Sequence, residues 1–299
     1  MKTILTTGSN GLLGQKLTEK ILAEGRANLI ATSKGANRGS IKEGYVYESM
    51  DILDENRVRY LLELYKPDAI IHTAALTNVD ACEADKETAH QLNVDAVALL
   101  LKICKIHNIH FIHLSTDFVF DGEDGPYAEE DAVNPISYYG ETKVLAEDLV
   151  KSFEGNWAII RTILVYGVST DMSRSNIVLW AKNALESGSA IQVVNDQWRM
   201  PTLAEDLAEA CLLAVEKQAQ GFYHISGKDY MSISELVRKV ADFWKLDQSP
   251  IAEISSASLN QTAKRPRRTG FSLDKAIIEL GYRPHSFEEG LAILNKQIK

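Results

Sequence analysis

The chain has 299 residues, of which 45% are apolar and 24% charged, and its formal net charge at pH 7 is −9. This length and composition fit a globular protein with a large core, built as one α/β domain or as two closely packed lobes. The negative charge excludes a general nucleic-acid or anionic-membrane surface, because both would repel it. An anionic small molecule would need a local basic cluster.

The cysteines indicate the compartment. Cys82, Cys104 and Cys211 are an odd number at wide spacing, which favours a reducing compartment over a disulfide framework. No apolar segment reaches the length of a signal-peptide core or a membrane span. We therefore expect a cytoplasmic protein without nucleic-acid or membrane partners.

A glycine-rich loop stands between a short β-branched run, residues 3–7, and an amphipathic helical pattern. Its spacing is G-x-x-G-x-x-G. The glycines let the backbone turn tightly and approach a pyrophosphate, and the N–H groups at the helix start favour negative charge. The strand before the loop and the helix after it indicate dinucleotide binding. The contacts expected here are Gly8, Asn10, Gly11, Leu12, Leu13 and Gly14.

The end of the second predicted strand, residues 28–33, is where a nicotinamide enzyme selects its cofactor. An acidic residue there would bind the ribose 2′-hydroxyl, but this chain has Ser33, Lys34 and Arg38. These residues suit a 2′-phosphate and favour NADP(H), with NAD(H) as the alternative. A solvated charged loop is the competing interpretation. Asp51 and Ile52, after the next strand, complete this group of expected contacts.

Two continuous apolar runs, residues 68–75 and 109–116, predict buried parallel strands. The second run delivers the hydroxyls of Ser115 and Thr116 to the carboxyl edge of the sheet, where open α/β sheets bind ligands. Small side chains at the end of the first run would let a cofactor lie close over the sheet. The further cofactor contacts expected from this region are Ala74, Ala75, Thr77, Asn93 and Ser115.

A predicted helix places Tyr139 and Lys143 four residues apart, and therefore on one face. A neighbouring ammonium favours the phenolate and lowers the pKa of a tyrosine, which makes it a usable proton donor or acceptor near neutral pH. Tyr138 has Thr142 at this offset and lacks such a partner. An ordinary surface pair has the same spacing, so the interpretation depends on the glycine loop and the hydroxyl on the preceding strand.

Strand and helix patterns alternate over the first 165 residues, which predicts an α/β fold with a doubly wound, Rossmann-type parallel sheet. A smaller C-terminal α+β lobe would pack directly on this domain. Residues 1–167 and 202–225 are expected to form the dinucleotide-binding domain, and residues 168–201 and 226–299 the substrate-binding lobe. In the lobe, the pattern predicts a polar loop over 169–175 and helices over 177–185, 232–244, 273–280 and 287–297.

Several segments resemble the extended short-chain dehydrogenase/reductases and, within that group, the dTDP-4-dehydrorhamnose reductases. They follow the order and approximate spacing of that family over nearly the full length. The segments are T-T-G-S-N-G-L-L-G at 6–14, H-T-A-A-L-T-N-V-D at 72–80, S-T-D-F-V-F-D-G at 115–122, Y-G-E-T-K at 139–143, D-Q-W-R-M-P-T at 196–202 and R-P at 265–266.

The resemblance implies that Thr116 is the catalytic hydroxyl, that Tyr139 donates the proton, and that Lys143 both tunes the phenol and binds the nicotinamide ribose. It also implies NADPH-dependent reduction of the 4-keto group of a nucleotide-linked deoxysugar. A homodimer is a possible assembly. The residues expected to contact the nucleotide-sugar are Thr77, Val119, Phe120, Arg199, Arg265 and Arg268.

The chain also departs from the family pattern. Residues 198–200, W-R-M, stand where a small residue is expected, and residues 267–269, R-R-T, replace an asparagine-serine pair. Both segments belong to the expected substrate lobe, so the identity of the sugar stays open. The basic residues of segment 264–268 could hold a diphosphate, although a solvated loop is an equally simple explanation.

Two other functions remain open. An epimerase or dehydratase would retain its NAD(P), and a non-catalytic regulatory subunit would bind NADP as a structural ligand. Intact Thr116, Tyr139 and Lys143 argue against the second of these. No metal is expected, because the histidines between residues 107 and 113 span a helix end and a strand and would not converge.

Overall fold

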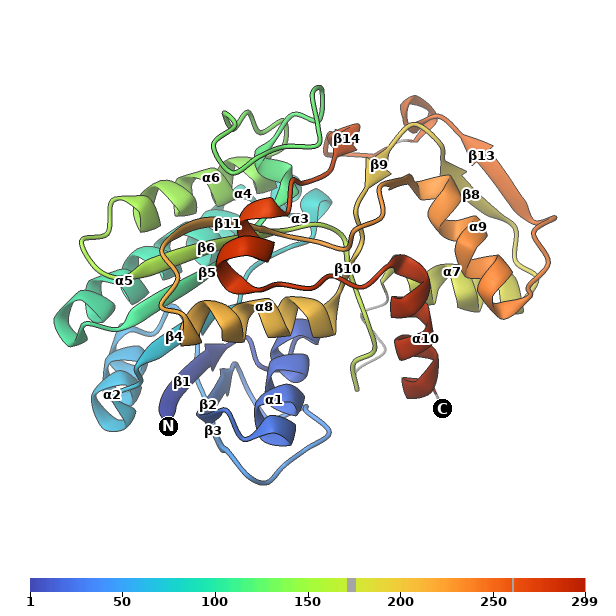
Figure 1. Ribbon diagram of the computed structural model, residues 1–299. Coiled ribbons are helices and arrows are strands. Elements are labelled where there is room, and N and C mark those ends of the chain that lie inside the picture. The colour runs from blue at the N-terminus through green and yellow to red at the C-terminus, as the bar shows by residue number, and fades with distance from the viewer. Residues whose placement is uncertain (171–175, 260, 299) are drawn as a thin grey trace.

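The computed structural model describes residues 1–170, 176–259 and 261–298. Its centre is a seven-stranded sheet in the order β11-β6-β5-β4-β1-β2-β3 (Figure 1), with every neighbouring pair parallel. The strand order reverses at β1, so the prediction of a doubly wound Rossmann-type sheet is confirmed. The strands are β1 (Lys2–Thr7), β2 (Ala27–Ser33), β3 (Val46–Ser49), β4 (Ala69–His72), β5 (His110–Thr116), β6 (Trp157–Thr162) and β11 (Gly221–Ile225).

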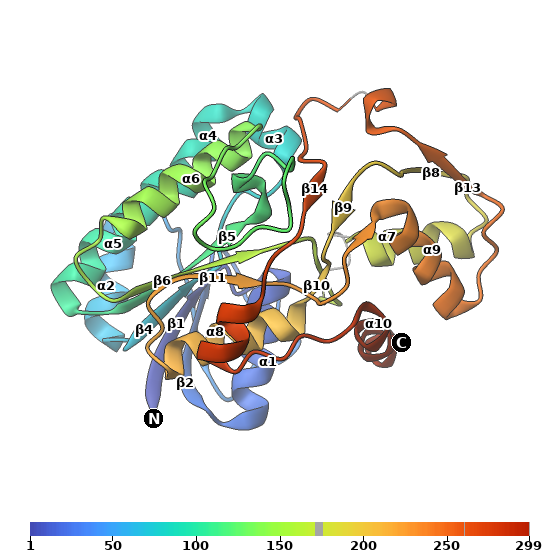
Figure 2. The ribbon, with the colours of Figure 1, turned by 45° about the horizontal axis from the view of Figure 1, so that its top comes forward.

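Helices cover both faces of this sheet (Figure 2), and each face has its own apolar core. One face carries α1 (Leu12–Glu24) and α8 (Ala204–Glu216). The other carries α2 (Glu55–Tyr65), α5 (Ala96–His107) and α6 (Tyr138–Lys151). The connection from β4 to α5 runs through α3 (Val79–Ala84), α4 (Lys86–His90) and the π-helical turn η1 (Gln91–Asp95).

Short elements build the rest of the chain. Strand β7 (Val165–Tyr166) pairs with β10 (Thr202–Leu203), and β8 (Ile191–Val194) pairs with β13 (Ile251–Ile254). A third small sheet contains β12 (Met231–Ser232), β9 (Trp198–Arg199) and β14 (Arg268–Thr269). The remaining helical elements are α7 (Ile177–Glu186), α9 (Ile233–Trp244), α10 (Phe287–Gln297) and the 3-10 turns η2 (Asp117–Val119) and η3 (Ser256–Ser258).

Most of the helices predicted for the C-terminal part are confirmed. Helix α9 starts with a capping box in which Ser232 and Glu235 satisfy each other's backbone N–H groups. The helix expected over residues 273–280 is shorter and includes a π-helical turn, η4 (Ala276–Leu280), which ends at Gly281 with φ 72°. Most of the loop expected over residues 169–175 lies outside the described residues.

The C-terminal segment does not stay within one lobe. Ala276, Leu280 and Tyr282 join the core on the α1 and α8 side of the large sheet, whereas Phe287 and Leu291 of α10 join a separate core with α7 and α9. The segment therefore crosses from one core to the other. The domain boundaries derived from sequence stay a prediction.

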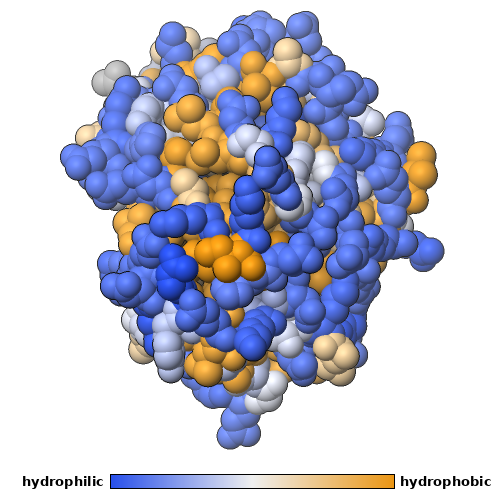
Figure 3. Space-filling model, turned by 90° about the vertical axis from the view of Figure 1, so that its left-hand side faces the viewer, coloured by the Kyte–Doolittle hydropathy of each residue, from blue (hydrophilic) through white to orange (hydrophobic). Residues whose placement is uncertain are grey.

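One side of the molecule carries a mixed apolar and hydrophilic surface. Figure 3, which views the side of the molecule that carries α2 and α5, shows apolar patches interrupted by hydrophilic side chains. Within the described residues, no helix has both the length and the apolar character needed to cross a membrane. A homodimer stays a prediction.

Candidate active site

Two cavities lie along the carboxyl edge of the large sheet, where the loops that follow the parallel strands begin. The first, of about 450 Å³, lies at the ends of β1, β2 and β3, and the second, of about 480 Å³, lies at the ends of β4 and β5. Thr73 and Ala75 line both cavities. The two cavities therefore adjoin each other, and together they are called the trough.

The 450 Å³ cavity collects most of the residues predicted to bind the cofactor. Lys34 Nζ lies 2.7 Å from Asp51 Oδ2 across its rim, and the backbone N–H of Arg38 donates to Asn10 Oδ1. The ion pair lowers the pKa of Asp51, so this carboxylate is charged and partly neutralises Lys34. The predicted residues that line this cavity are Gly8, Asn10, Gly11, Ser33, Lys34, Arg38, Asp51, Ile52, Ala74 and Ala75.

The glycine loop has the geometry of a phosphate cradle. A Cβ on Gly8, where φ is 68°, would lie 2.8 Å from the Ala74 nitrogen, and one on Gly14 would lie 2.5 Å from Ser9 Cα. Gly11, the N-cap of α1, provides no side chain to satisfy the first N–H groups of the helix. The cradle therefore fits a dinucleotide diphosphate, which would take up these donors.

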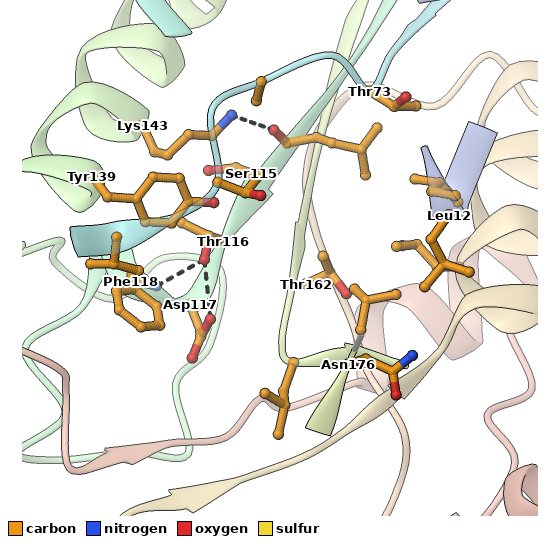
Figure 4. Close-up of a pocket in the computed structure, with 18 of the residues that line it drawn as sticks. Leu12, Thr73, Ser115, Thr116, Asp117, Phe118, Tyr139, Lys143, Thr162 and Asn176 are labelled. Atoms are coloured by element: carbon orange, nitrogen blue, oxygen red, sulfur yellow. Dashed lines mark hydrogen bonds between the residues drawn. The ribbon is translucent and has the colours of Figure 1, made fainter. Parts of the chain in front are cut away.

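The 480 Å³ cavity brings together the three residues predicted to be catalytic (Figure 4). Thr116, Tyr139 and Lys143 line one wall, and Leu12 and Leu13 of the glycine loop line the other. The predicted cofactor residues Ala75, Thr77 and Ser115 also line it. Gly14 and Asn93 lie behind the trough: Gly14 packs on the loop backbone, and the side chain of Asn93 binds the backbone N–H and carbonyl of Leu76.

Helix α6 approaches the end of β5 so closely that Gly140 has no room for a side chain. A Cβ there would collide with the carbonyl oxygen of Phe118. Ser137 caps the helix by accepting from the Gly140 N–H. This contact places Tyr139 beside Thr116, whereas Tyr138 is half-buried outside the cavity lining, with the ammonium of Lys86 4.7 Å from its ring centre.

The acid–base properties of the pair differ from those expected. Burial raises the pKa of Tyr139, a side-chain contact with Thr116 opposes this rise, and Lys143 is not among the groups that lower it. The expected lowering by Lys143 is therefore wrong for the protein alone, because the loss of water around the phenol dominates. Burial also lowers the pKa of Lys143 to about 8, against the opposing charge of Glu147.

Asp117 is a functional residue that the sequence did not identify. Thr116 Oγ1 donates to Asp117 Oδ1 over 3.1 Å and accepts from the N–H of Phe118 over 3.2 Å. Thr269 donates to the other carboxylate oxygen, and Arg199 Nε lies 3.6 Å from it. Burial raises the pKa of Asp117, and the charge of Arg199 opposes this. The carboxylate thus orients the hydroxyl of Thr116.

A second buried network lies behind Ser115, whose hydroxyl donates to Glu147 over 2.6 Å. Glu147 forms a bidentate ion pair with Arg161, with N–O distances of 2.9 and 2.7 Å. The signal for Glu147 was available in the sequence, because Tyr139, Lys143 and Glu147 recur every four residues on one helix face. Ser115 is therefore engaged in holding α6 against β5 and β6.

The residues predicted to bind substrate divide into three groups. Thr77 and Arg199 line the 480 Å³ cavity. Val119 and Phe120 are completely buried in a core cluster and do not line it, so they contribute support rather than exposed contact surface. Arg265 and Arg268 also lie outside its lining: Arg265 pairs with Asp80 over 2.6 Å, and Arg268 lies over the ring of Trp198.

The remaining polar clusters do not add a metal centre. No group of three or more His, Cys, Asp or Glu residues in the described part of the chain could hold a metal ion. The three cysteines are buried and unpaired.

A doubly wound sheet, a glycine cradle and a Thr-Tyr-Lys wall on one trough constitute the arrangement of the extended short-chain dehydrogenase/reductases. The chain belongs to the family described as the RmlD substrate binding domain, which matches residues 1–299.

Individual relatives agree with this family. The chain is 32% identical, over 96% of its length and 95% of the relative, to a probable low-salt glycan biosynthesis reductase, Agl14, of Haloferax volcanii. It is 31% identical, over 89% of its length and 79% of the relative, to methionine adenosyltransferase 2 subunit beta of Bos taurus. A dTDP-4-dehydrorhamnose reductase structure from Clostridium acetobutylicum superposes with a TM-score of 0.86 at 26% identity, over 99% of both chains.

Proposed function

We propose that the chain uses NADPH to reduce the 4-keto group of a nucleotide-linked deoxysugar. The observation that carries this proposal is the trough, in which the cavity at the glycine cradle adjoins the cavity that Thr116, Tyr139 and Lys143 line. The family match and the similarity to reductases support it. Bound NADPH would supply the hydride, and the protein would supply the proton and the positioning.

The side chains divide the work on the developing alkoxide. Because its pKa is raised, Tyr139 carries its proton at neutral pH and can donate it to the substrate oxygen. The hydroxyl of Thr116, fixed between Asp117 and the Phe118 N–H, stabilises the same oxygen when it turns its proton from the carboxylate to the substrate. Lys143 lies in the cavity wall, where its ammonium can hold the nicotinamide ribose.

Tyr139→Phe tests the assignment, with Tyr138→Phe as the matched control because Tyr138 does not line the cavity. The first variant should bind NADPH as the wild type does and lose most reduction of a dTDP-4-keto-6-deoxy sugar, followed by NADPH absorbance. The control should retain activity. Equal turnover in both variants would refute the role of Tyr139.

The NADPH absorbance assay also separates the reductase from the two alternative functions. An epimerase or dehydratase converts its sugar without net consumption of added NADPH. A regulatory subunit, an alternative that the similarity to the subunit from Bos taurus keeps in view, binds the nucleotide and consumes none. Stoichiometric oxidation of NADPH with a keto sugar is expected only of the reductase.

A further inference from the structure

The ammonium of Lys143 has three N–H donors, and two of them are engaged by protein acceptors. One reaches the carbonyl oxygen of Leu114 over 2.6 Å, and the other reaches Nε2 of His113 over 3.2 Å. Both acceptors belong to β5, so this strand fixes the position of the ammonium. A single donor is left for the trough that Lys143 lines.

The state of the His113 ring follows from this contact. An ammonium can only donate, so the nitrogen facing it must carry a lone pair, and the proton of the neutral ring lies on Nδ1. Nδ1 has no partner among the described residues, and the ring is 1% exposed and packs against the rings of His72 and Phe111, which also stack on each other. The hydrogen bond to Lys143 is therefore the only one that this side chain makes in the described structure.

The surroundings keep the ring neutral. Burial, Lys143 and His72 all lower the pKa of His113 far below its usual value. The other titratable groups around Lys143 are Tyr139 and Glu147 on α6, His72 on β4 and Asp117 beyond Thr116. None of them replaces the acceptor that His113 provides, because Glu147 is committed to Ser115 and Arg161.

We propose that His113 is a positioning residue for Lys143: its unprotonated Nε2 fixes the ammonium so that the third donor points at the nicotinamide ribose. This inference rests on the proposed function. With the acceptor removed, the ammonium would be free to rotate about its Cε–Nζ bond. The charged form of Lys143 would also lose a hydrogen bond, so its pKa would fall. The cofactor would then be held less firmly, and the protonated form of Lys143 would be lost at lower pH.

The test compares His113→Leu, which removes the acceptor, with His113→Gln, whose amide oxygen reaches the Nε2 position. NADPH affinity is measured by nucleotide fluorescence across pH 6 to 10 without sugar, and turnover is measured separately. In the wild type, affinity should fall as pH rises through about 8. His113→Leu should move this fall to lower pH by about one unit and weaken binding at neutral pH about fivefold. His113→Gln should restore the wild-type profile.

His110→Leu is the matched control, because His110 lies on the same strand, is equally buried and, among the described residues, bonds to the Ala219 carbonyl and not to Lys143. It should leave the profile unchanged. If His113→Leu does not fold, His113→Asn takes its place, since its shorter amide ends near Nδ1 and should shift the profile in the same way. An unshifted profile in the folded variant, or an equal shift in His113→Gln, would overturn the inference.

The two proposals fail differently. A wild type that binds NADPH with the expected profile but reduces no keto sugar refutes the proposed function and leaves the role of His113 in cofactor binding standing. Normal reduction with a profile insensitive to His113 refutes the inference alone. A wild type that does not bind NADPH overturns both.

Discussion

Arg199 Nε lies 3.6 Å from Asp117 Oδ2, and both side chains are almost completely buried at the wall of the larger cavity. The guanidinium also donates to the backbone carbonyls of Trp198, Pro266 and Arg267. One residue thus ties β9 and the segment before β14 to the turn that carries Thr116. This gives a structural role to Arg199, which belongs to the segment 198–200 where a small residue was expected.

Removing this cation should therefore destabilise the protein. Arg199→Met leaves the carboxylate of Asp117 buried without its counter-charge, which should lower the free energy of unfolding by about 3–5 kcal/mol in urea denaturation. Arg238→Met, which breaks an exposed pair with Glu253, is the control and should cost less than about 1 kcal/mol. Adding Asp117→Asn to Arg199→Met should recover part of the loss, and no recovery would argue against the charge as its cause.

Gly140→Ala tests the close approach of α6 to the turn η2, which follows Thr116. The new methyl group collides with the carbonyl oxygen of Phe118, so the helix must move away from Thr116. We expect a loss of about 1–3 kcal/mol in stability and, because Tyr139 is displaced from the reacting oxygen, a fall in kcat of about a hundredfold. Glu141→Ala, at the next and exposed position of the same helix, should leave kcat unchanged.

Lys34→Ala tests the cofactor preference. Lys34 stands at the rim of the smaller cavity, where it would face a 2′-phosphate, while its partner Asp51 disfavours a second negative charge. The variant should weaken NADPH binding about fivefold and leave NADH binding unchanged or improved, as measured by fluorescence titration. Lys42→Ala, which removes another lysine nearby, should alter neither affinity. Equal weakening of NADPH and NADH would place Lys34 away from the 2′ position.

The fold could be predicted from sequence because its signals are local. Alternating apolar strands and amphipathic helices, the glycine loop after β1 and the capping box at Ser232 each occupy a short window. The crossing of the C-terminal segment from one core to the other could not be predicted, because Ala276 and Phe287 carry similar apolar patterns and only tertiary packing separates them.

Part of the site could also be predicted, because some of its residues belong to local sequence motifs. Thr116, Tyr139 and Lys143 belong to recognisable local motifs, and the structure places them on one cavity. Asp117 and His113 could not be assigned, because their roles depend on partners brought together by folding. The direction of the Tyr139 pKa shift also depends on burial, which a spacing of four residues does not reveal.

Lys143, which we propose to bind the cofactor, lies at a position that opposes stability. Its pKa falls from 10.5 to about 8 because the folded protein disfavours a buried ammonium. One pKa unit corresponds to about 1.4 kcal/mol, so the charge costs the folded state about 3 kcal/mol below pH 8. Lys143→Met should therefore raise the free energy of unfolding at pH 7 by about 2 kcal/mol, after allowance for the two acceptors that it leaves behind, while abolishing reduction.

The pH dependence supplies the sharper test of this last prediction. Between about pH 8 and 10.5 the unfolded chain holds the lysine proton more tightly than the folded one. The stability of the wild type should therefore gain from this residue as pH rises through that window. Lys143→Met lacks this gain, so the stability difference between the two proteins should shrink from pH 7 to pH 10 in urea denaturation. A constant difference would show that Lys143 keeps an ordinary pKa in the folded protein.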